Sequence, residues 1–309
     1  MTIDLLPALA GRDFLDIADV TAAELRGLLA LAADIKAGHW RAGARAPLEG
    51  RHLALIFQKP SMRTRVSFEV AIGRLGGTPI TLADVDIGLG RREKVSDVGQ
   101  VLSRFTSGIV ARLFSHADLL ELARASQKPV INALTDRSHP CQVLADLLTL
   151  EERLGGLEGR RLAFVGDGNN VAISLIEAAA LTGLALTVIT PPRHYPPAEV
   201  TRQAHTVKVT SDLAALEGVD AVYTDVWTSM GQESEAEVRR REFAEYQVNR
   251  DLMAQAPRAI FMHCLPAHRG EEVTAEVIDG PQSVVFDEAE NRLHAQKGIL
   301  AWCLDAGPR

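Results

Sequence analysis

Short apolar runs alternate with amphipathic segments along most of this 309-residue chain, and no other feature constrains its fold as strongly. Residues 52–57, 108–114 and 129–134 are predicted strands, because each is a short apolar run. Residues 21–37 and 140–154 are predicted helices, the first with a capping box and the second with a proline in its first turn. Strands separated by helices predict an α/β protein with mostly parallel sheets covered on both faces. Further strands are predicted at 162–165, 184–189, 219–224, 259–264 and 283–286, and a closing helix near 288–304.

The chain is longer than one ordinary core requires, and it fits two domains of about 150 residues each. The glycine-rich stretch 155–159 is the best candidate for the boundary between them. The longest apolar stretch, 171–190, is about as long as a membrane span. Glu177 and the pair Thr182–Gly183 divide it into a helix, a turn and a strand, so we expect it to be part of a core.

Charge and cysteine content exclude several classes of function. The chain has 33 basic and 40 acidic residues, and its net charge of −7 argues against a nucleic acid or a membrane surface as its partner. An anionic ligand would therefore need a local cluster of arginines. The cysteines Cys141, Cys264 and Cys303 are widely spaced, and no secretion signal is evident at the N-terminus. Reduced thiols and a cytoplasmic location are therefore expected.

Four segments place polar residues beyond the carboxyl ends of predicted strands, where ligands bind in parallel sheets. The first, Lys59–Arg65, joins a strand to a helix and contributes two arginines and two hydroxyl groups. Unpaired backbone N–H groups and the positive end of the helix dipole make this junction a candidate phosphate cradle. A solvated basic turn is an equally good interpretation of the segment taken alone.

The other three segments are weaker signals individually. His139–Gln142 precedes a helix, where a histidine is more often a simple cap. Asp225–Gly231 offers a carboxylate and a hydroxyl group suited to a zwitterionic ligand with an amine, although ordinary polar turns have the same composition. In His263–Pro266 a strand ends at Cys264, and a buried structural thiol is the usual explanation of such a cysteine.

Together, in this order and at these separations, the segments form a specific pattern. The chain resembles the aspartate/ornithine carbamoyltransferase family, and within it the members that use ornithine. The resemblance extends from about residue 50 to about residue 300. Its motifs are Phe57–Arg65, His139–Gln142, Gly166–Asn170, the loop that begins at Asp225, His263–Pro266 and Glu290–Arg292.

The resemblance implies an enzyme that moves the carbamoyl group of carbamoyl phosphate onto the side-chain amine of ornithine. Arg63, Arg112, His139 and Cys264 would act in catalysis. Donors that polarise the carbonyl and neutralise the departing phosphate suffice for this reaction, so no metal ion and no organic cofactor is expected. The implied ligands of carbamoyl phosphate are Ser61, the Met62 backbone, Arg63, Thr64, Arg112, His139, Gln142, Cys264, the Leu265 backbone and Arg292.

For the acceptor, the resemblance implies that Asn170 and the Met230 backbone hold the α-carboxylate of ornithine. Asp225 and Ser229 would hold the α-ammonium group, and Cys264 would lie near the attacking nitrogen. Family members fold as two Rossmann-like domains and assemble as trimers with shared active sites. The loop that contains Met230 is expected to close once the amino acid has bound.

The resemblance also assigns a role to each domain. Residues 1–150 would bind carbamoyl phosphate, completed by a C-terminal helix at about 288–309, and residues 151–287 would bind ornithine. The expected partners are these two small molecules, and further copies of the chain in a homotrimer or an assembly of trimers.

The chain departs from the family pattern at Gly88. Ornithine enzymes commonly place a glutamine there that reaches the carbamoyl phosphate of the neighbouring subunit, and glycine has no side chain to do so. We hypothesise that Arg91, Arg92 or Lys94 replaces it, because the aspartate enzymes use a lysine in this loop.

Three other interpretations of the sequence compete with this one. The nearest is a carbamoyltransferase for aspartate, putrescine or an acylated ornithine, although Cys264 and the Asp225 loop favour ornithine. Gly166 and Gly168 suggest a nicotinamide dehydrogenase, but a valine replaces the third glycine of that fingerprint. The third interpretation is a non-catalytic homologue, which would be expected to lack Arg63, His139, Asp225 or Cys264. All four are present, and only the missing side chain at Gly88 favours this interpretation.

Overall fold

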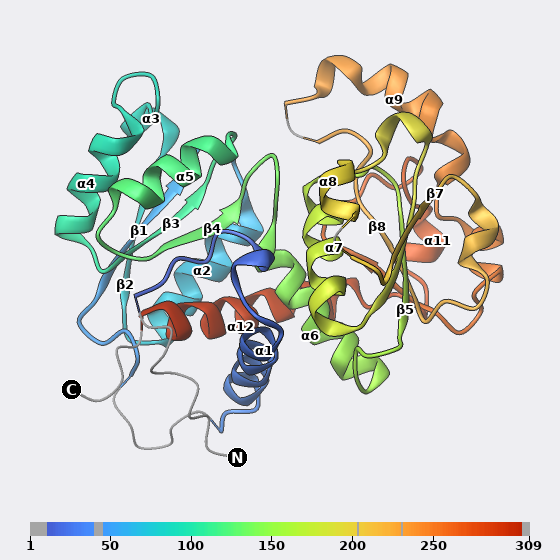
Figure 1. Ribbon diagram of the computed structural model, residues 1–309, viewed down its shortest axis with the longest axis horizontal. Helices are drawn as coiled ribbons and strands as arrows, with labels where there is room; N and C mark the ends of the chain where they lie inside the picture. The colour runs from blue at the N-terminus through green and yellow to red at the C-terminus, as the bar shows by residue number, and fades with distance from the viewer. Residues whose placement is uncertain (1–10, 40–45, 203, 230, 305–309) are drawn as a thin grey trace. The chain divides into compact units, whose positions relative to one another are not determined.

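The computed structural model forms two compact units, the first made of residues 1–148 and 291–309 and the second of residues 149–290 (Figure 1). Each division falls inside a helix, α6 (Pro140–Leu154) or α12 (Val285–Leu304). The residues described by the structure are 11–39, 46–202, 204–229 and 231–304.

The first unit is built on a four-stranded parallel sheet of order β2-β1-β3-β4. The two strands β3 and β4 are buried along their whole length, as expected for the apolar runs of a parallel sheet. The edge strand β2 is half-exposed and contains Pro79, a residue that edge strands tolerate. The strands are β1 (His52–Phe57), β2 (Thr78–Ala83), β3 (Gly108–Arg112) and β4 (Val130–Leu134).

Helices cover both faces of this sheet (Figure 1). Val98 of α4 and Leu122 of α5 belong to one buried cluster with Ile56 and Ile109 of the strands. α1 begins with the predicted capping box, in which the Thr21 hydroxyl accepts from the Glu24 backbone N–H at 3.2 Å. The helices are α1 (Ala22–Lys36), α2 (Met62–Arg74), α3 (Asp84–Ile87), α4 (Val95–Phe105) and α5 (His116–Ala125).

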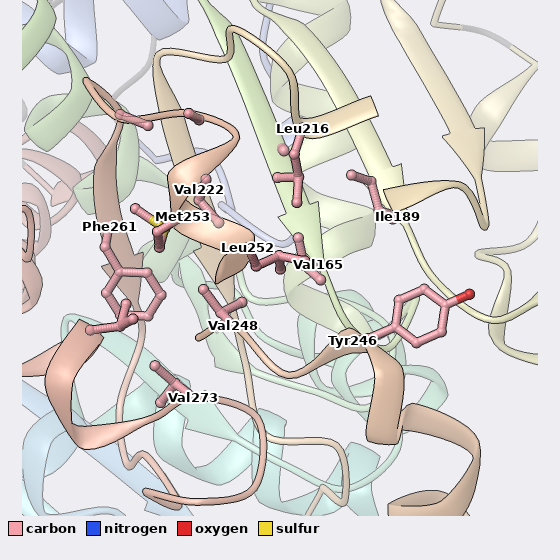
Figure 2. Packing of buried hydrophobic residues seen from close by; sticks show 14 of the residues in the cluster. Val165, Ile189, Leu216, Val222, Tyr246, Val248, Leu252, Met253, Phe261 and Val273 are labelled. Atoms are coloured by element: carbon pink, nitrogen blue, oxygen red, sulfur yellow. The ribbon is translucent and has the colours of Figure 1, made fainter. Parts of the chain in front are cut away.

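The second unit contains a five-stranded parallel sheet of order β7-β6-β5-β8-β9. A buried apolar cluster lies on one face of it, where Val165 and Val222 of the strands pack with Leu252 and Met253 of α10 (Figure 2). The strands are β5 (Arg161–Val165), β6 (Ala185–Ile189), β7 (Val207–Thr210), β8 (Ala221–Thr224) and β9 (Ile260–His263). The main helices are α7 (Asn170–Thr182), α8 (Ala198–Thr201), α9 (Ala236–Phe243), α10 (Arg250–Ala254) and α11 (Ala275–Ile278).

In each sheet the chain reverses its direction of travel once. In the first unit it moves outward from β1 to β2 and then returns to β3 on the other side of β1. In the second unit it moves from β5 to β6 and β7, and then returns to β8 on the other side of β5. Ligands of open α/β sheets bind at the carboxyl ends of the strands next to such a reversal. The loops after β1 and β3, and those after β5 and β8, are therefore the positions to inspect.

The predicted α/β class with two parallel sheets is confirmed, and one predicted strand is wrong. Residues 283–286 form no strand, because Ser283 makes a single bridge to Phe261 and α12 begins at Val285. The apolar stretch 171–190 consists of α7, a left-handed Gly183 and β6, as expected for a core segment. Among the described residues, no helix has both the length and the apolar character that a membrane crossing requires.

Candidate active site

The loop after β1 gathers hydroxyl and guanidinium groups around Thr64, a fully buried residue of α2. Ser61 caps the helix, because its Oγ accepts from the Thr64 backbone N–H at 3.3 Å. The Thr64 hydroxyl oxygen lies 3.0 Å from the Ser61 hydroxyl, 2.6 Å from an Arg292 guanidinium nitrogen and 3.4 Å from one of Arg112. Hydroxyl and guanidinium donors therefore converge on the N-terminus of α2. A cluster of such donors at a helix N-terminus suits an anion.

The charged side chains around Thr64 are buried. Arg112 stands at the end of β3 with 6% of its surface exposed, and Arg292 in α12 has 3%. Burial lowers the pKa of the His139 imidazole well below 6.5, and the positive charges of Arg292 and Arg112 lower this pKa further. His139 is therefore neutral near pH 7 and offers hydrogen bonds without adding charge.

The side chains in the first turn of α6 have two different roles, packing in the core and hydrogen bonding. Cys141 is fully buried, its thiol contacts the Asn132 carbonyl at 3.1 Å, and burial raises the pKa of this thiol to about 12. Gln142 donates through Nε2 to Asp146 Oδ1 at 2.8 Å, which fixes the orientation of its amide. Within the motif of residues 139–142, Cys141 is therefore a core residue, whereas His139 and Gln142 are the polar groups.

In the second unit, polar side chains converge on Asp225, which directly follows β8. Asp225 Oδ1 accepts from the Cys264 thiol at 3.0 Å and from the Val226 backbone N–H at 2.8 Å. Its Oδ2 accepts from Asn169 Nδ2 at 2.8 Å. Asn169 is also the N-cap of α7, so Asn170 becomes the first residue of that helix. A fixed carboxylate beside a helix N-terminus provides one group for an ammonium and another for a carboxylate.

The loop after β9 is held by a buried histidine–glutamate pair. His263 Nε2 lies 3.1 Å from Glu272 Oε1, and both side chains are fully buried. The other ring nitrogen of His263 accepts from the Leu265 backbone N–H at 2.9 Å, so the hydrogen on the ring belongs to Nε2. Leu265 has a φ of 56°, which a leucine rarely adopts, and such conformations cluster at active sites and ligand clamps.

Two groups of metal-binding residue types come close together among the described residues, Asp225–His263–Cys264 and His268–Glu271–Glu272. Hydrogen bonds within the protein account for the first, because His263 uses both ring nitrogens and the Cys264 thiol donates to Asp225. In the second, Glu271 pairs with Arg240 at 3.1 Å. The sequence-based expectation that no metal is required stays a prediction.

Comparison with known proteins places this geometry in a family. The family model for the carbamoyl-P binding domain of aspartate/ornithine carbamoyltransferases matches residues 12–152, and that for their Asp/Orn binding domain matches residues 158–303. The chain belongs to the aspartate/ornithine carbamoyltransferase family. The resemblance inferred from the motifs is therefore confirmed, and the dehydrogenase reading is wrong.

Individual members of the family are similar over nearly their full length. The ornithine carbamoyltransferase of Symbiobacterium thermophilum is 54% identical over 306 residues, covering 96% of this chain and 98% of that protein. The one from Deinococcus radiodurans is 50% identical, with 97% and 99% covered. The solved structure of ornithine carbamoyltransferase from Pyrococcus furiosus has a TM-score of 0.92 and 48% identity, covering 97% of this chain and 99% of that one.

The structure brings most of the predicted residues together within each unit. Around Thr64 it assembles Ser61, Arg112 and Arg292, and it places Arg63 in the same helix turn. The Met62 side chain is 69% exposed, and the predicted role of its backbone stays a prediction. In the second unit Asp225 contacts Cys264, and Ser229 donates its backbone N–H to Gln232 at 3.2 Å. Met230 lies outside the described residues.

Sequence reasoning missed several residues that hold this site. The sequence assigns no role to Asn169, whereas its amide donates directly to Asp225 Oδ2. Glu272 was not considered, although its partner His263 belongs to a motif. The structure also explains why residue 168 is glycine without a bound dinucleotide. A Cβ at this position would lie 2.4 Å from the His194 carbonyl oxygen, so glycine is required by the close approach of the protein's own backbone.

Proposed function

We propose that this family member transfers the carbamoyl group of carbamoyl phosphate to the side-chain amine of L-ornithine, giving L-citrulline and phosphate in arginine metabolism. The observation that carries the acceptor assignment is the hydrogen bond between Cys264 and Asp225. Aspartate enzymes usually have proline after the motif histidine, so they lack this thiol. The high identity to relatives named ornithine carbamoyltransferase supports the same acceptor.

The first unit is the proposed carbamoyl phosphate half of the site. Ser61, the Met62 backbone, Arg63 and Thr64 hold the phosphate at the N-terminus of α2, with Arg112 beside them. Thr64, Arg112 and neutral His139 polarise the carbonyl oxygen, and Gln142 receives the amide. Arg292 closes the donor set from α12. The guanidinium groups stabilise charge that moves onto the phosphate as it departs.

The second unit is the proposed ornithine half. Asp225 and Ser229 hold the α-ammonium group, Asn170 and the Met230 backbone hold the α-carboxylate, and Cys264 lies beside the reacting nitrogen. Putrescine has no carboxylate, and an acylated ornithine has no α-ammonium group for Asp225. The paired polar groups therefore select unmodified ornithine.

The reaction requires the neutral amine. An ornithine side chain resembles lysine, with an ordinary pKa of about 10.4, so selecting the neutral form near pH 7 costs about 4.6 kcal/mol. The amine nitrogen forms a bond to the carbamoyl carbon, the bond from that carbon to the phosphate oxygen breaks, and the nitrogen loses one proton, which balances the charge on the departing phosphate. Phosphate leaves with the electron pair of the broken bond.

We further propose a cytoplasmic homotrimer, or an assembly of trimers, whose first domain is residues 1–150 with 288–309 and whose second is residues 151–287. Apolar side chains exposed along α2, the edge strand β2 and the short helix α3 support self-association, because monomers rarely leave such patches uncovered. Those side chains are Met62, Val66, Val70, Ile80 and Val85.

Within this assembly, Lys94 is the proposed substitute for the family glutamine at position 88. Arg91 pairs with Asp84, and Arg92 donates to the Asp86 carbonyl, so both hold their own loop together. Lys94 is exposed at the N-cap of α4 and pairs with no acid of the described part of the chain. Changing Lys94 to Ala should raise the KM for carbamoyl phosphate more than changing Arg91 does.

The proposed function is tested by citrulline formation from carbamoyl phosphate with ornithine, aspartate, putrescine or an acylated ornithine. We expect product with ornithine only, and its loss in Arg63→Ala. Arg65→Ala is the matched control, because this exposed neighbour pairs with Glu69 on the surface of α2. Product with another amine would keep the family and move the acceptor, and no product with any amine would overturn the proposal.

A further inference from the structure

Arg239 forms an arrangement that the proposed reaction does not use. It lies in α9 beside two exposed arginines, yet only 7% of it is exposed. Its Nη1 donates to Asp167 Oδ2 at 2.8 Å and to the Trp227 carbonyl at 2.9 Å, and its Nε donates to Glu235 at 3.1 Å. One guanidinium group thus joins the turn after β5, the segment after β8 and helix α9.

The joined segments are those that carry the proposed ornithine ligands. Asp167 stands three residues before Asn170, and Trp227 stands midway between Asp225 and Ser229. The strands that lead into them are paired neighbours, because β5 and β8 run side by side in the sheet. A contact that fixes Asp167 to the Trp227 backbone therefore fixes the spacing between the two ligand segments.

Stability alone explains this arrangement poorly. A buried ion pair often contributes little to the free energy of folding, because desolvation offsets the attraction. The Glu235 carboxylate is 61% exposed, so its contact with Arg239 also contributes little. The Trp227 carbonyl is a neutral group, so its hydrogen bond with Arg239 does not serve to balance charge. This hydrogen bond instead fixes the position of the backbone at Trp227.

The charge of Arg239 also separates two neighbouring carboxylates. Burial raises the pKa of Asp167, the adjacent Asp225 raises it further, and Arg239 is the strongest influence in the opposite direction. The other titratable neighbour is His194, whose Nδ1 lies 3.7 Å from Asp167 Oδ1. With Arg239 bound to Asp167, the carboxylate of Asp225 is the one available to a ligand ammonium group.

We propose that Arg239 is a positioning residue for the amino-acid half of the site, acting through the Trp227 carbonyl and Asp167. The inference rests on the proposed function, and it predicts an effect on ornithine that carbamoyl phosphate does not share. The same helix supplies a matched control, because Arg241 is 82% exposed and lies 3.9 Å from the exposed Glu237.

The first test compares steady-state rates of the full-length protein as Arg239→Met, Arg239→Lys and Arg241→Met. Arg239→Met should raise the ornithine KM roughly 10-fold or more while the carbamoyl phosphate KM stays within about twofold. Arg239→Lys should recover part of the loss, because an ammonium group restores the charge but not the forked geometry. An ornithine KM for Arg239→Met within about twofold of that for Arg241→Met would overturn the inference.

The second test measures amide hydrogen exchange without substrate. Exchange at residues 226–229 should be faster in Arg239→Met than in wild type or Arg241→Met, whereas exchange in β5 and β8 stays unchanged. Unchanged exchange at 226–229 would overturn the inference, even if the wild type formed no citrulline and the proposed function had failed. If Arg239→Met does not fold, Asp167→Asn replaces it, and an unchanged ornithine KM in that variant would equally overturn the inference.

Discussion

The Cys264 thiol donates a hydrogen bond to Asp225 Oδ1 across 3.0 Å, and the two residues directly follow neighbouring strands of the second sheet. Asp225 also accepts from Asn169 and from the backbone N–H of Val226. The carboxylate is therefore held in one orientation by its own protein before any ligand arrives. Preorganisation of this kind lowers the reorganisation that binding and reaction require.

This arrangement predicts selective labelling of one thiol. Cys264 is the partly exposed cysteine, whereas burial raises the pKa of Cys141 to about 12 and that of Cys303 well above 9. The thiolate is the reactive form, so one thiol per folded chain should react with an aromatic disulfide reagent. The other two should react only after unfolding, and Cys264→Ser should show no rapid reaction. Rapid labelling of Cys141 in the folded protein would contradict this assignment.

The pH dependence of activity should follow the acceptor amine rather than His139. His139 is already neutral well below pH 6.5, so its charge does not change at higher pH. At low ornithine the rate should rise about tenfold per pH unit between about pH 6 and pH 8, because the neutral amine fraction rises at that rate. His139→Asn should lower the rate at every pH and keep the slope. A flat profile under chemistry-limited conditions would show that the amine is not selected in this way.

His139 also links folding to pH. Its pKa in the folded chain lies well below 6.5, so between these values the unfolded chain binds a proton that the folded chain does not. The fold should therefore lose about 1.4 kcal/mol per pH unit from this group as pH falls below about 6.5, until the folded pKa is reached. Urea unfolding at about pH 7.5 and about pH 5.5 should show a smaller loss in His139→Asn than in wild type. Equal losses would assign the acid sensitivity to other groups.

Much of the fold could be predicted, because its strong signals are local. The helix Pro140–Leu154 was predicted with both ends correct, since proline starts it and glycine follows it. The strands at 78–83 and 207–210 were missed, because they are partly exposed edge strands with mixed composition. The short run 283–286 resembles a strand, but three apolar residues cannot outweigh the helical pattern that follows them.

The candidate site was predictable only where a loop follows a strand. The residues around Thr64 and Asp225 lie at such ends, and general rules for parallel sheets point to them. Arg239 was not predictable, because it lies 72 residues from Asp167 and is followed by two further arginines, a pattern typical of a solvated helix face. Its burial depends on packing between distant segments, which no local pattern encodes.

The glycine at position 88 should resist replacement for two separate reasons. Gly88 has a φ of 63°, and a Cβ there would lie 2.9 Å from the Cβ of Arg92. Gly90 has a φ of 74°, but a Cβ there would meet no atom nearer than 3.8 Å. Both substitutions by Ala incur the left-handed strain of about 1–2 kcal/mol, and only Gly88→Ala adds the contact with Arg92. A glutamine at this position would meet the same contact.

The corresponding measurement is the free energy of unfolding in urea. Gly88→Ala should be more destabilising than Gly90→Ala, and adding Arg92→Gly should remove most of that difference. The two changes at 88 and 92 would then be non-additive, as expected for residues in contact. If Gly88→Ala and Gly90→Ala cost the same, the Arg92 side chain does not determine the residue at position 88.

Gly168 should tolerate no side chain in the ornithine half. A Cβ at this position would lie 2.4 Å from the His194 carbonyl oxygen and 2.5 Å from the Pro196 nitrogen, both of them backbone atoms that cannot move independently. The Gly168 N–H also donates to that carbonyl at 3.0 Å, so the turn would have to separate from the segment it rests on. We expect Gly168→Ala to destabilise the fold by about 1–3 kcal/mol. Because Asn169 and Asn170 follow directly, the ornithine KM should rise while the carbamoyl phosphate KM does not.

Gly73→Ala is the control, since a Cβ there meets no atom within 4 Å and alanine favours the helix. Equal ornithine KM values in the two variants would mean that the turn tolerates the displacement without moving the asparagines.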